Sequence, residues 1–353
     1  MSGTNVIKRD FSGLVEVHGT INLSQFYYRG GRSDADTVKI ELTVDSVRFR
    51  TNEQAPWQEN LEVFNEGYVR GNPVVDSQNR ITVRLQGVDA PELHYHAKRG
   101  IPEKDMTDDQ RRNWKNREFR QWGSAVATWK LATFLNAYEE AIGLGIVRAV
   151  AFSKVDSPSD VFDVYGRFVG DINIIRAPRK NSNINQWLAK EGWTFPSFYN
   201  SMSNDEIMTL TDICKKARIA RSGVWKMYAD VLLPFDTNLY LPGKSEPFVD
   251  VLKDSGKVNP PKIFRRQVVY EVNYRAGIYK ESTLKKYLSK SKDKDYYYNT
   301  NDFLNDNVPA KKQKLEDMLE DNGKLRLEPW DMIFEEKPTE LKDWNNKKID
   351  SWY

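Results

Sequence analysis

Alternation of apolar and polar positions is the clearest pattern in the N-terminal part of the chain. Every second side chain is apolar over short runs, as in a strand with one buried face. Five segments are expected to form strands: residues 14–28, 38–44, 81–85, 146–152 and 165–175. Between the second and third of these segments, about residues 46–80 are rich in Asn, Glu, Gly and Pro. That composition predicts an inserted loop or hairpin excursion.

Helical spacing of apolar side chains appears between and after these strands. Residues 116–142 carry Trp122, Val126 and Trp129 near helical spacing. Shorter helices are expected at residues 184–191 and 205–221, each followed by glycine. Short strands with a few helices predict an α+β fold. We expect an OB-fold five-stranded β-barrel with helices packed on it.

The chain is long enough for more than one domain. We expect the barrel domain in residues 14–232 and a linker in residues 233–261, where Pro, Gly, Lys and Ser gather. Residues 262–353 then form a small C-terminal α+β accessory region of unknown function. A helix is expected near residues 263–274 and a strand at residues 324–334.

Composition adds little about partners. The net charge is only +3, so nucleic-acid binding cannot be argued from total charge. Cys214 is the only cysteine, so no intrachain disulfide forms, as is usual in a reducing compartment. Residues 1–13 lack the apolar core of a secretory signal, and no apolar run is long enough to span a membrane. These features predict a cytoplasmic protein without a membrane segment, with export by a non-classical route left open.

Three clusters of charged residues lie at expected strand ends. Residues 34–39 (DADTVK) open one strand, residues 84–92 (RLQGVDAPE) close another, and residues 163–167 (DVYGR) open a third. In a small barrel, strand ends that are distant in sequence can meet at one rim. We therefore expect these clusters to converge.

The residue types in these clusters suit phosphodiester hydrolysis. Carboxylates bind hard cations, and the planar fork of arginine matches phosphate oxygens. A further carboxylate can activate water. Pro91 biases Ala90 toward extended backbone, which allows the Ala90 carbonyl to face a metal held by Asp89.

The same clusters resemble the staphylococcal nuclease (thermonuclease) domain family. Residues 84–92 resemble its R-L-x-G-[IV]-D-[AT]-P-E signature, residues 34–38 its D-[GA]-D-T-[VI] segment, and residues 163–167 its D-x-Y-G-R segment. The order of the clusters also agrees, with a long helix between the second and third. The resemblance covers about residues 14–232 and says nothing about the C-terminal third.

The resemblance implies a calcium-dependent nuclease that cleaves DNA and/or RNA with little sequence preference and leaves 3′-phosphate ends. Nucleic acid would be the substrate and Ca²⁺ the cofactor. The implied roles of the matching residues are as follows: Asp36, Asp89 and the Ala90 backbone carbonyl bind the metal, Glu92 is the general base, Arg84 and Arg167 clamp the phosphate, and Tyr165 lines the nucleotide site.

Two departures from the family matter. The excursion at residues 46–80 is longer than the tight hairpin expected of the family. After Gly192, either Phe198 or Tyr199 could take the family's base-stacking role, so neither is assigned to the site.

Other residues allow competing interpretations. His94 and His96 follow Glu92 and suit either a transition-metal site or, as we favour, exposed loop positions. Residues 296–298, three tyrosines in a row, suit packing better than base stacking.

The rival to an active nuclease is a binding module that keeps the barrel and serves as a nucleic-acid or partner scaffold. Arg84, Arg167, Asp36, Asp89 and Glu92 are all present, which favours the enzyme. The C-terminal region is expected either to dock on the barrel domain or to recruit a protein partner.

Overall fold

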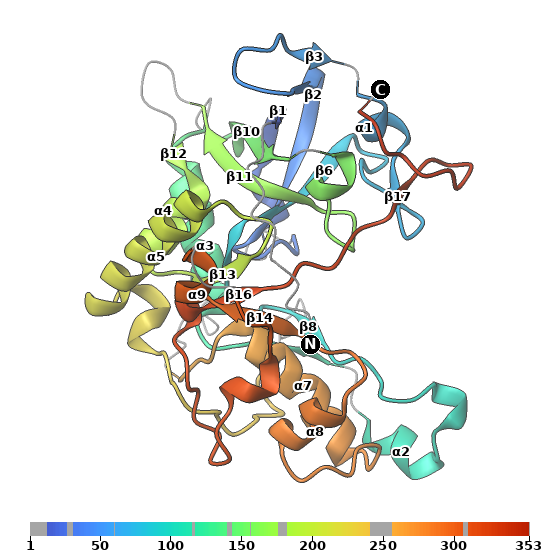
Figure 1. Cartoon of the computed structure of the whole chain (residues 1–353), viewed down its shortest axis with the longest axis vertical. Helices are drawn as coiled ribbons and strands as arrows, with labels where there is room; N and C mark the ends of the chain where they lie inside the picture. Colours follow the sequence, from blue (N-terminus) through green and yellow to red (C-terminus); the bar gives the residue numbers. More distant parts are fainter. Residues whose placement is uncertain are drawn as a thin grey trace.

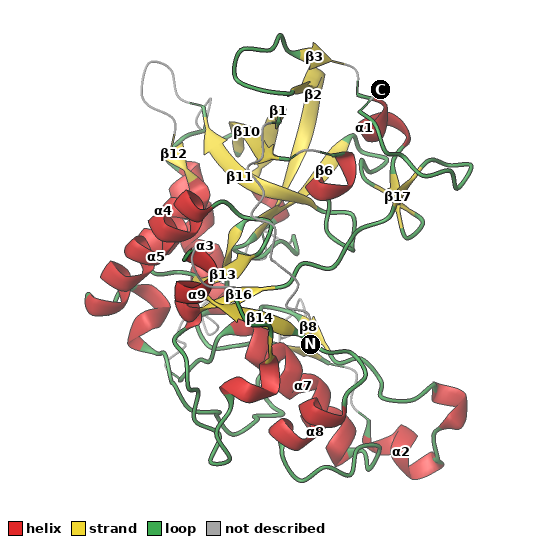
Figure 2. Cartoon of the chain, viewed as in Figure 1, coloured by secondary structure: helices red, strands yellow, loops and turns green. Residues whose placement is uncertain are grey.

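A computed structural model describes residues 13–26, 31–59, 61–114, 117–139, 143–155, 157–175, 182–240, 256–305 and 310–352. Figures 1 and 2 show the arrangement of the elements. Among the described residues, no helix is both long and apolar enough to cross a membrane.

Five strands of the described chain close into a barrel. They are ordered β1-β10-β11-β6-β2, and a further pairing of β1 with β2 closes the ring. All neighbours are antiparallel except β6 and β11, which run parallel. The barrel strands are β1 (Leu14–Asn22), β2 (Thr37–Arg50), β6 (Arg80–Leu85), β10 (Ile146–Lys154) and β11 (Phe168–Ile174). The predicted five-stranded barrel is therefore confirmed.

The alternation in the sequence explains which face of each strand is inside. Along β6, Ile81, Val83 and Leu85 are buried, while the residues between them are partly exposed. The main hydrophobic core contains these side chains together with those of the other barrel strands. Strand alternation thus fixes the direction in which Arg84 points.

Helices and short strands complete the segment up to residue 240. The strand expected over residues 14–28 ends at Asn22 and continues as a 3-10 turn, and residues 27–30 lie outside the described residues. The helix expected over residues 116–142 is shorter and begins at Ser124, directly after Gly123, whose φ is +76. Residues 116 and 140–142 of the expected helix lie outside the described part of the chain. Further elements are α2 (Asp108–Asn113), β8 (Tyr95–His96), β9 (Glu118–Phe119), α3 (Ser124–Asn136), β12 (Ser182–Asn183), α4 (Ile184–Lys190) and α5 (Asn204–Ile219).

A second sheet joins the barrel segment to the C-terminal region. Its described strands are ordered β15-β14-β16-β13-β7, and β13 runs parallel to β16. The members are β7 (Gly87–Asp89), β13 (Phe195–Tyr199), β14 (Tyr296–Asn299), β15 (Gln313–Lys314) and β16 (Met332–Phe334). Tyr298, Phe303 and Ile333 also belong to the main hydrophobic core. The C-terminal region therefore packs directly on the barrel segment, while its separation as a domain stays a prediction.

Three described helices lie in the C-terminal region: α7 (Pro261–Arg275), α8 (Leu284–Lys290) and α9 (Thr300–Leu304). The helix expected near residues 263–274 is thus confirmed. The strand expected at 324–334 is reduced to β16, because residues 329–331 form a 3-10 turn that begins with Pro329. Tyr297 and Tyr298 are buried and Tyr296 is partly buried, which confirms packing for this tyrosine run.

The insertion at residues 46–80 is more ordered than expected. Strand β2 continues to Arg50, and the excursion then forms β3 (Gln58–Glu59), α1 (Glu62–Glu66), β4 (Tyr68–Val69) and β5 (Asn72–Pro73). The end of the chain returns to it: β17 (Leu341–Lys342) pairs with β4, and Trp352 stacks on Phe49 with ring centroids 4.5 Å apart. Figure 1 shows the C-terminal segment running up to this part of the barrel.

Candidate active site

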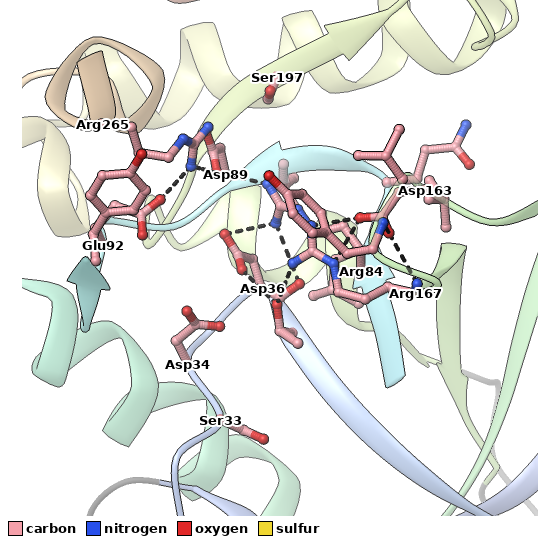
Figure 3. A pocket seen from close by; sticks show the side chains of 18 of the residues that line it. Ser33, Asp34, Asp36, Arg84, Asp89, Glu92, Asp163, Arg167, Ser197 and Arg265 are labelled. Atoms are coloured by element: carbon pink, nitrogen blue, oxygen red, sulfur yellow. Dashed lines mark hydrogen bonds and ion pairs between the residues drawn. The ribbon is translucent and has the colours of Figure 1, made fainter. Parts of the chain in front are cut away.

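The three charged clusters meet at one rim of the barrel. In the strand register, Arg84 of β6 lies opposite Thr37 at the start of β2 and opposite Val169 of β11. Asp36 immediately precedes β2, and Arg167 immediately precedes β11. The pairing therefore brings together side chains from all three clusters, as Figure 3 shows.

Arg84 forms the centre of the network. Its Nη1 lies 2.7 Å from Asp36 Oδ2, and its Nη2 lies 2.7 Å from Asp89 Oδ1. Burial alone would lower the pKa of Arg84, but the two carboxylates outweigh it and raise the pKa. Arg84 is thus a permanently charged guanidinium that bridges the two predicted metal ligands.

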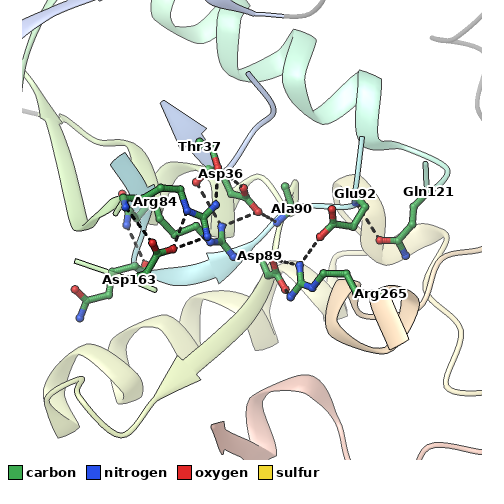
Figure 4. A network of polar contacts seen from close by, with 12 residues as sticks. Asp36, Thr37, Arg84, Asp89, Ala90, Glu92, Gln121, Asp163 and Arg265 are labelled. Atoms are coloured by element: carbon green, nitrogen blue, oxygen red, sulfur yellow. Dashed lines mark hydrogen bonds and ion pairs between the residues drawn. The ribbon is translucent and has the colours of Figure 1, made fainter. Parts of the chain in front are cut away.

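Asp36 also fixes the loop that carries the second cluster. The Ala90 backbone N–H donates to Asp36 Oδ2 at 2.7 Å, and the Thr37 hydroxyl donates to Asp36 Oδ1 at 3.1 Å. Because Ala90 lies between Asp89 and Glu92 in sequence, this hydrogen bond sets the position of both carboxylates relative to the barrel (Figure 4).

Asp89 and Glu92 lie deep in the site. Asp89 is 2% exposed and stands on β7, where Phe195 of β13 is its partner. The Glu92 backbone N–H donates to Gln121 Oε1 at 3.0 Å, and Gln121 N–H donates to the Glu92 carbonyl at 2.7 Å. This reciprocal pair holds the backbone of Glu92 in place.

The electrostatics of the two carboxyl groups differ. Burial raises the pKa of both. For Asp89, Arg265 and Arg84 outweigh burial and hold the pKa below its ordinary value. For Glu92, Arg265 opposes burial, but repulsion from Asp89 and Asp36 adds to it, so the pKa stays raised. Glu92 is thus the more basic carboxylate of the pair, as a proton acceptor requires.

Arg167 and Tyr165 lie on the hairpin that leads into β11. Asp163 accepts from Arg167 Nε at 2.8 Å and from the Tyr165 backbone N–H at 2.9 Å, and so shapes the turn. Arg167 Nη1 lies 3.4 Å from the Thr37 hydroxyl, which places this guanidinium beside the Arg84 cluster. Tyr165 is 60% exposed, and the Arg167 guanidinium carbon lies 5.5 Å from its ring centroid.

These residues line a cleft of about 1200 Å³. Residues 84–89 and Glu92 form part of its wall, and the hairpin before β11 contributes Asp163, Val164, Tyr165 and Arg167. The C-terminal region contributes Lys262, Arg265 and Arg266, whereas Ala90 is not among the lining residues. Phe198 is fully buried and pairs with Ile333, so it cannot stack on a base in the cleft. Tyr199 lines the cleft, with Lys262 Nζ 5.2 Å from its ring centroid.

The sequence did not indicate every polar residue of the site. Arg265 contacts Asp89 and Glu92 from helix α7, and Gln121 braces Glu92 from the segment before α3. Arg265 lies 173 positions after Glu92, and no local motif surrounds it. Asp163 belongs to the segment 163–167, but its hydrogen bond with Arg167 was not predicted.

Among the described residues, no group of three or more His, Cys, Asp and Glu side chains is arranged to hold a metal ion. The predicted calcium set has only two side chains, Asp36 and Asp89, and a main-chain carbonyl. His94 Nε2 lies 2.7 Å from the Arg32 carbonyl and His96 Nε2 lies 3.2 Å from Glu118, so these histidines contact other groups.

A comparison with known families bears on this geometry. Residues 82–227 match the family model described as staphylococcal nuclease homologue. The match contains the second and third charged clusters, whereas strand β2 and Asp36 lie N-terminal to it and Arg265 lies C-terminal to it. No curated protein matches the chain.

Proposed function

Because the chain carries a staphylococcal nuclease domain, which indicates nuclease-type activity on nucleic acid, we propose that it is a calcium-dependent nuclease that hydrolyses phosphodiester bonds in DNA and/or RNA. One observation carries the proposal. Arg84 joins Asp36 to Asp89, Arg265 joins Asp89 to Glu92, and Arg167 lies at the edge of this network beside Thr37. These groups come from separate segments and have the types that phosphoryl chemistry requires.

The arginines would bind the phosphate. Arg84 is held by Asp36 and Asp89, and Arg167 is held by Asp163, so each fork has a fixed orientation before substrate arrives. Such preorganised donors stabilise charge that develops on phosphoryl oxygens in the transition state. Arg84 and Arg167 are therefore assigned to the phosphate clamp.

Glu92 would act as the general base. In the proposed step, its carboxylate takes a proton from water while the water oxygen bonds to phosphorus. The bond between phosphorus and the 5′-oxygen breaks, and the 5′-oxygen takes a proton from solvent. The products are a 3′-phosphate end and a 5′-hydroxyl end.

The donor set suits a hard divalent cation. Asp36 and Asp89 offer carboxylate oxygens, the ligand type that calcium prefers. Nearby, burial together with the Asp36 and Glu92 carboxylates raises the pKa of Asp34 well above its ordinary value. Arg84 pairs with Asp36 and Asp89, and Arg265 pairs with Asp89 and Glu92. The mutual repulsion of these neighbouring carboxyl groups supports a bound cation. Asp36, Asp89 and the Ala90 carbonyl would hold Ca²⁺, which would offset charge on the phosphate.

Low sequence preference follows from the kind of contacts proposed. Phosphate contacts position a nucleic acid but carry no base information. Tyr165 is well exposed at the cleft, and an aromatic ring can stack on any base. The substrate is accordingly proposed to be DNA and/or RNA without a defined recognition sequence.

The test is digestion of plasmid DNA and total RNA in calcium or in a chelator, with Glu92→Gln as the control protein. We expect cleavage in calcium, none in the chelator, and 5′-hydroxyl ends that a polynucleotide kinase labels without phosphatase treatment. Cleavage in the chelator would contradict the calcium requirement. Retained nucleic-acid binding without cleavage would favour a binding module instead. A cytoplasmic location and a protein partner for the C-terminal region stay predictions.

A further inference from the structure

Arg265 reaches the site from helix α7, outside the segment that matches the nuclease family. Its Nη2 lies 2.9 Å from Asp89 Oδ2, and its Nη1 donates to Glu92 Oε1 and lies 3.2 Å from Asp89 Oδ1. One guanidinium therefore spans the predicted metal ligand and the proposed general base, as Figure 4 shows.

Helix α7 is firmly anchored where it carries Arg265. Gln267 donates to the Leu233 carbonyl at 2.6 Å, and Asn273 donates to the Lys98 carbonyl at 2.9 Å and accepts from the Gly100 N–H at 2.8 Å. Val268 and Val272 pack in a cluster with Phe119 and Phe235. These buried contacts give the Arg265 side chain, only 25% exposed, a defined origin.

The same anchoring extends to the loop of Glu92. Gln121, which pairs with the Glu92 backbone, also donates from Nε2 to the Asn259 carbonyl at 2.8 Å. Asn259 lies two residues before α7 and in turn donates to the Ala229 and Val231 carbonyls. The start of α7 and the Glu92 loop are thus joined through one buried side chain.

The charges explain why a guanidinium is needed at this point. Arg265 pairs with both Asp89 and Glu92, and without it these two like charges would repel each other across the site. Arginine has several donors in a rigid fork, so it can bind two carboxylates at once, whereas lysine offers a single charged nitrogen. Because helix α7 is anchored by buried hydrogen bonds, it holds the guanidinium of Arg265 in a fixed position.

We infer that Arg265 is a positioning residue that orients Glu92 against Asp89, so that the C-terminal region completes the active site. This inference rests on the proposed nuclease function. Arg265 would act through Glu92, and the variant Arg265→Gln would replace the charged fork by a shorter, neutral amide.

The experiment measures kcat, KM and Tm of the full-length wild-type protein and of four variants. These are Arg265→Gln, Arg265→Lys, Glu92→Gln and the double variant that combines Arg265→Gln with Glu92→Gln. Arg275→Gln is the matched control for kcat, since Arg275 lies on the same helix outside the cleft, where it pairs with Glu271 and donates to the Phe235 carbonyl. We expect Arg265→Gln to lower kcat by about tenfold to hundredfold with a much smaller change in KM. Arg265→Lys should recover part of the loss, and Arg275→Gln should have the wild-type kcat.

The double variant separates positioning from general structural support. If Arg265 acts through Glu92, adding Arg265→Gln to Glu92→Gln should reduce kcat no further, and the Tm changes should also be non-additive. Additive effects, wild-type turnover of Arg265→Gln, or faster turnover of that variant would overturn the inference. In each of these outcomes, cleavage of nucleic acid by the wild-type protein would leave the proposed nuclease function standing. If the wild-type protein cleaves no nucleic acid, both the nuclease function and the role of Arg265 are overturned.

Discussion

Arg84 Nη2 lies 2.7 Å from Asp89 Oδ1, although the two residues are only five positions apart. The contact requires the chain to turn sharply after β6 ends at Leu85. Gly87 makes this turn with φ +75, and β7 then leaves the barrel to pair with β13. The backbone at Gly87 therefore determines whether Asp89 meets Arg84.

Gly87→Ala should lower both stability and turnover. A residue with a Cβ at this φ costs roughly 1–2 kcal/mol, and the added Cβ would also lie 2.4 Å from Leu210 Cδ1. Gly71→Ala is the control, because Gly71 has φ +79 but nothing within 4 Å of the added Cβ. Urea unfolding should show a larger loss for Gly87→Ala, and equal losses would contradict a crowded turn.

Glu92→Gln should reduce turnover by about 10²–10⁴-fold, the range for loss of a general base. The hydrogen bonds that brace this position involve the Glu92 backbone, so the fold should persist. Steady-state rates with saturating calcium and substrate measure the effect, and thermal unfolding checks the fold. Turnover equal to wild type in a folded variant would show that another group accepts the proton.

Asp89→Asn should raise the calcium concentration needed for half-maximal turnover, because one of the two carboxylate ligands becomes neutral. Asp163→Asn is the matched control. Asp163 holds Arg167 and touches no proposed metal ligand in the described structure, so this change should lower turnover at an unaltered calcium requirement. Calcium titrations of the cleavage rate distinguish the two. The same shift in both variants would argue against a metal role for Asp89.

Much of the site was predictable because its key residues lie in short local motifs. Residues 84–92 carry a guanidinium, two carboxylates and the turn between them, and strand pairing adds Asp36 and Arg167. Alternation along β6 was also sufficient to indicate which side chains face the core. These features depend on neighbours in sequence or on the barrel register.

Arg265 and β13 were not predictable for two physical reasons. Arg265 reaches Glu92 only because α7 docks through buried contacts between distant segments. Strand β13 is buried on both faces over Phe195 to Phe198 and contains Pro196, so it shows neither alternation nor a favourable strand composition. Both depend on tertiary packing that local patterns do not carry.

Asp171 should make the protein less stable as pH rises. Burial raises its pKa to about 7, with Glu206 adding to burial while Asn183 and Lys154 oppose it. The fold therefore favours the protonated acid, and this contribution is present below the ordinary aspartate pKa of about 4 and lost as pH rises through about 7. Asp171→Asn stays neutral and still offers an oxygen to Asn183.

Urea unfolding at several pH values tests this. Between about pH 4 and pH 8, the free energy of unfolding of Asp171→Asn minus that of wild type should increase with pH. Asp160→Asn serves as a control outside the Asp171 pocket. A constant difference between Asp171→Asn and wild type across this range would show that Asp171 ionises normally in the folded protein.

A chain shortened to residues 1–232 should be both less stable and less active than the full protein. Removal of β16 would leave Phe198 and Tyr199 of β13 without their parallel partner, and removal of α7 would take away Arg265. The main core would also lose Tyr298, Phe303 and Ile333, and apolar surface exposed in this way destabilises the fold.

Thermal unfolding and calcium-dependent cleavage by the two chains measure these losses. Because most of the stability loss comes from core packing and the activity loss from Arg265, the full chain with Arg265→Gln should reproduce the activity loss with a much smaller loss of stability. Unchanged stability and turnover in the shortened chain would mean that the C-terminal region contributes nothing to either within this polypeptide.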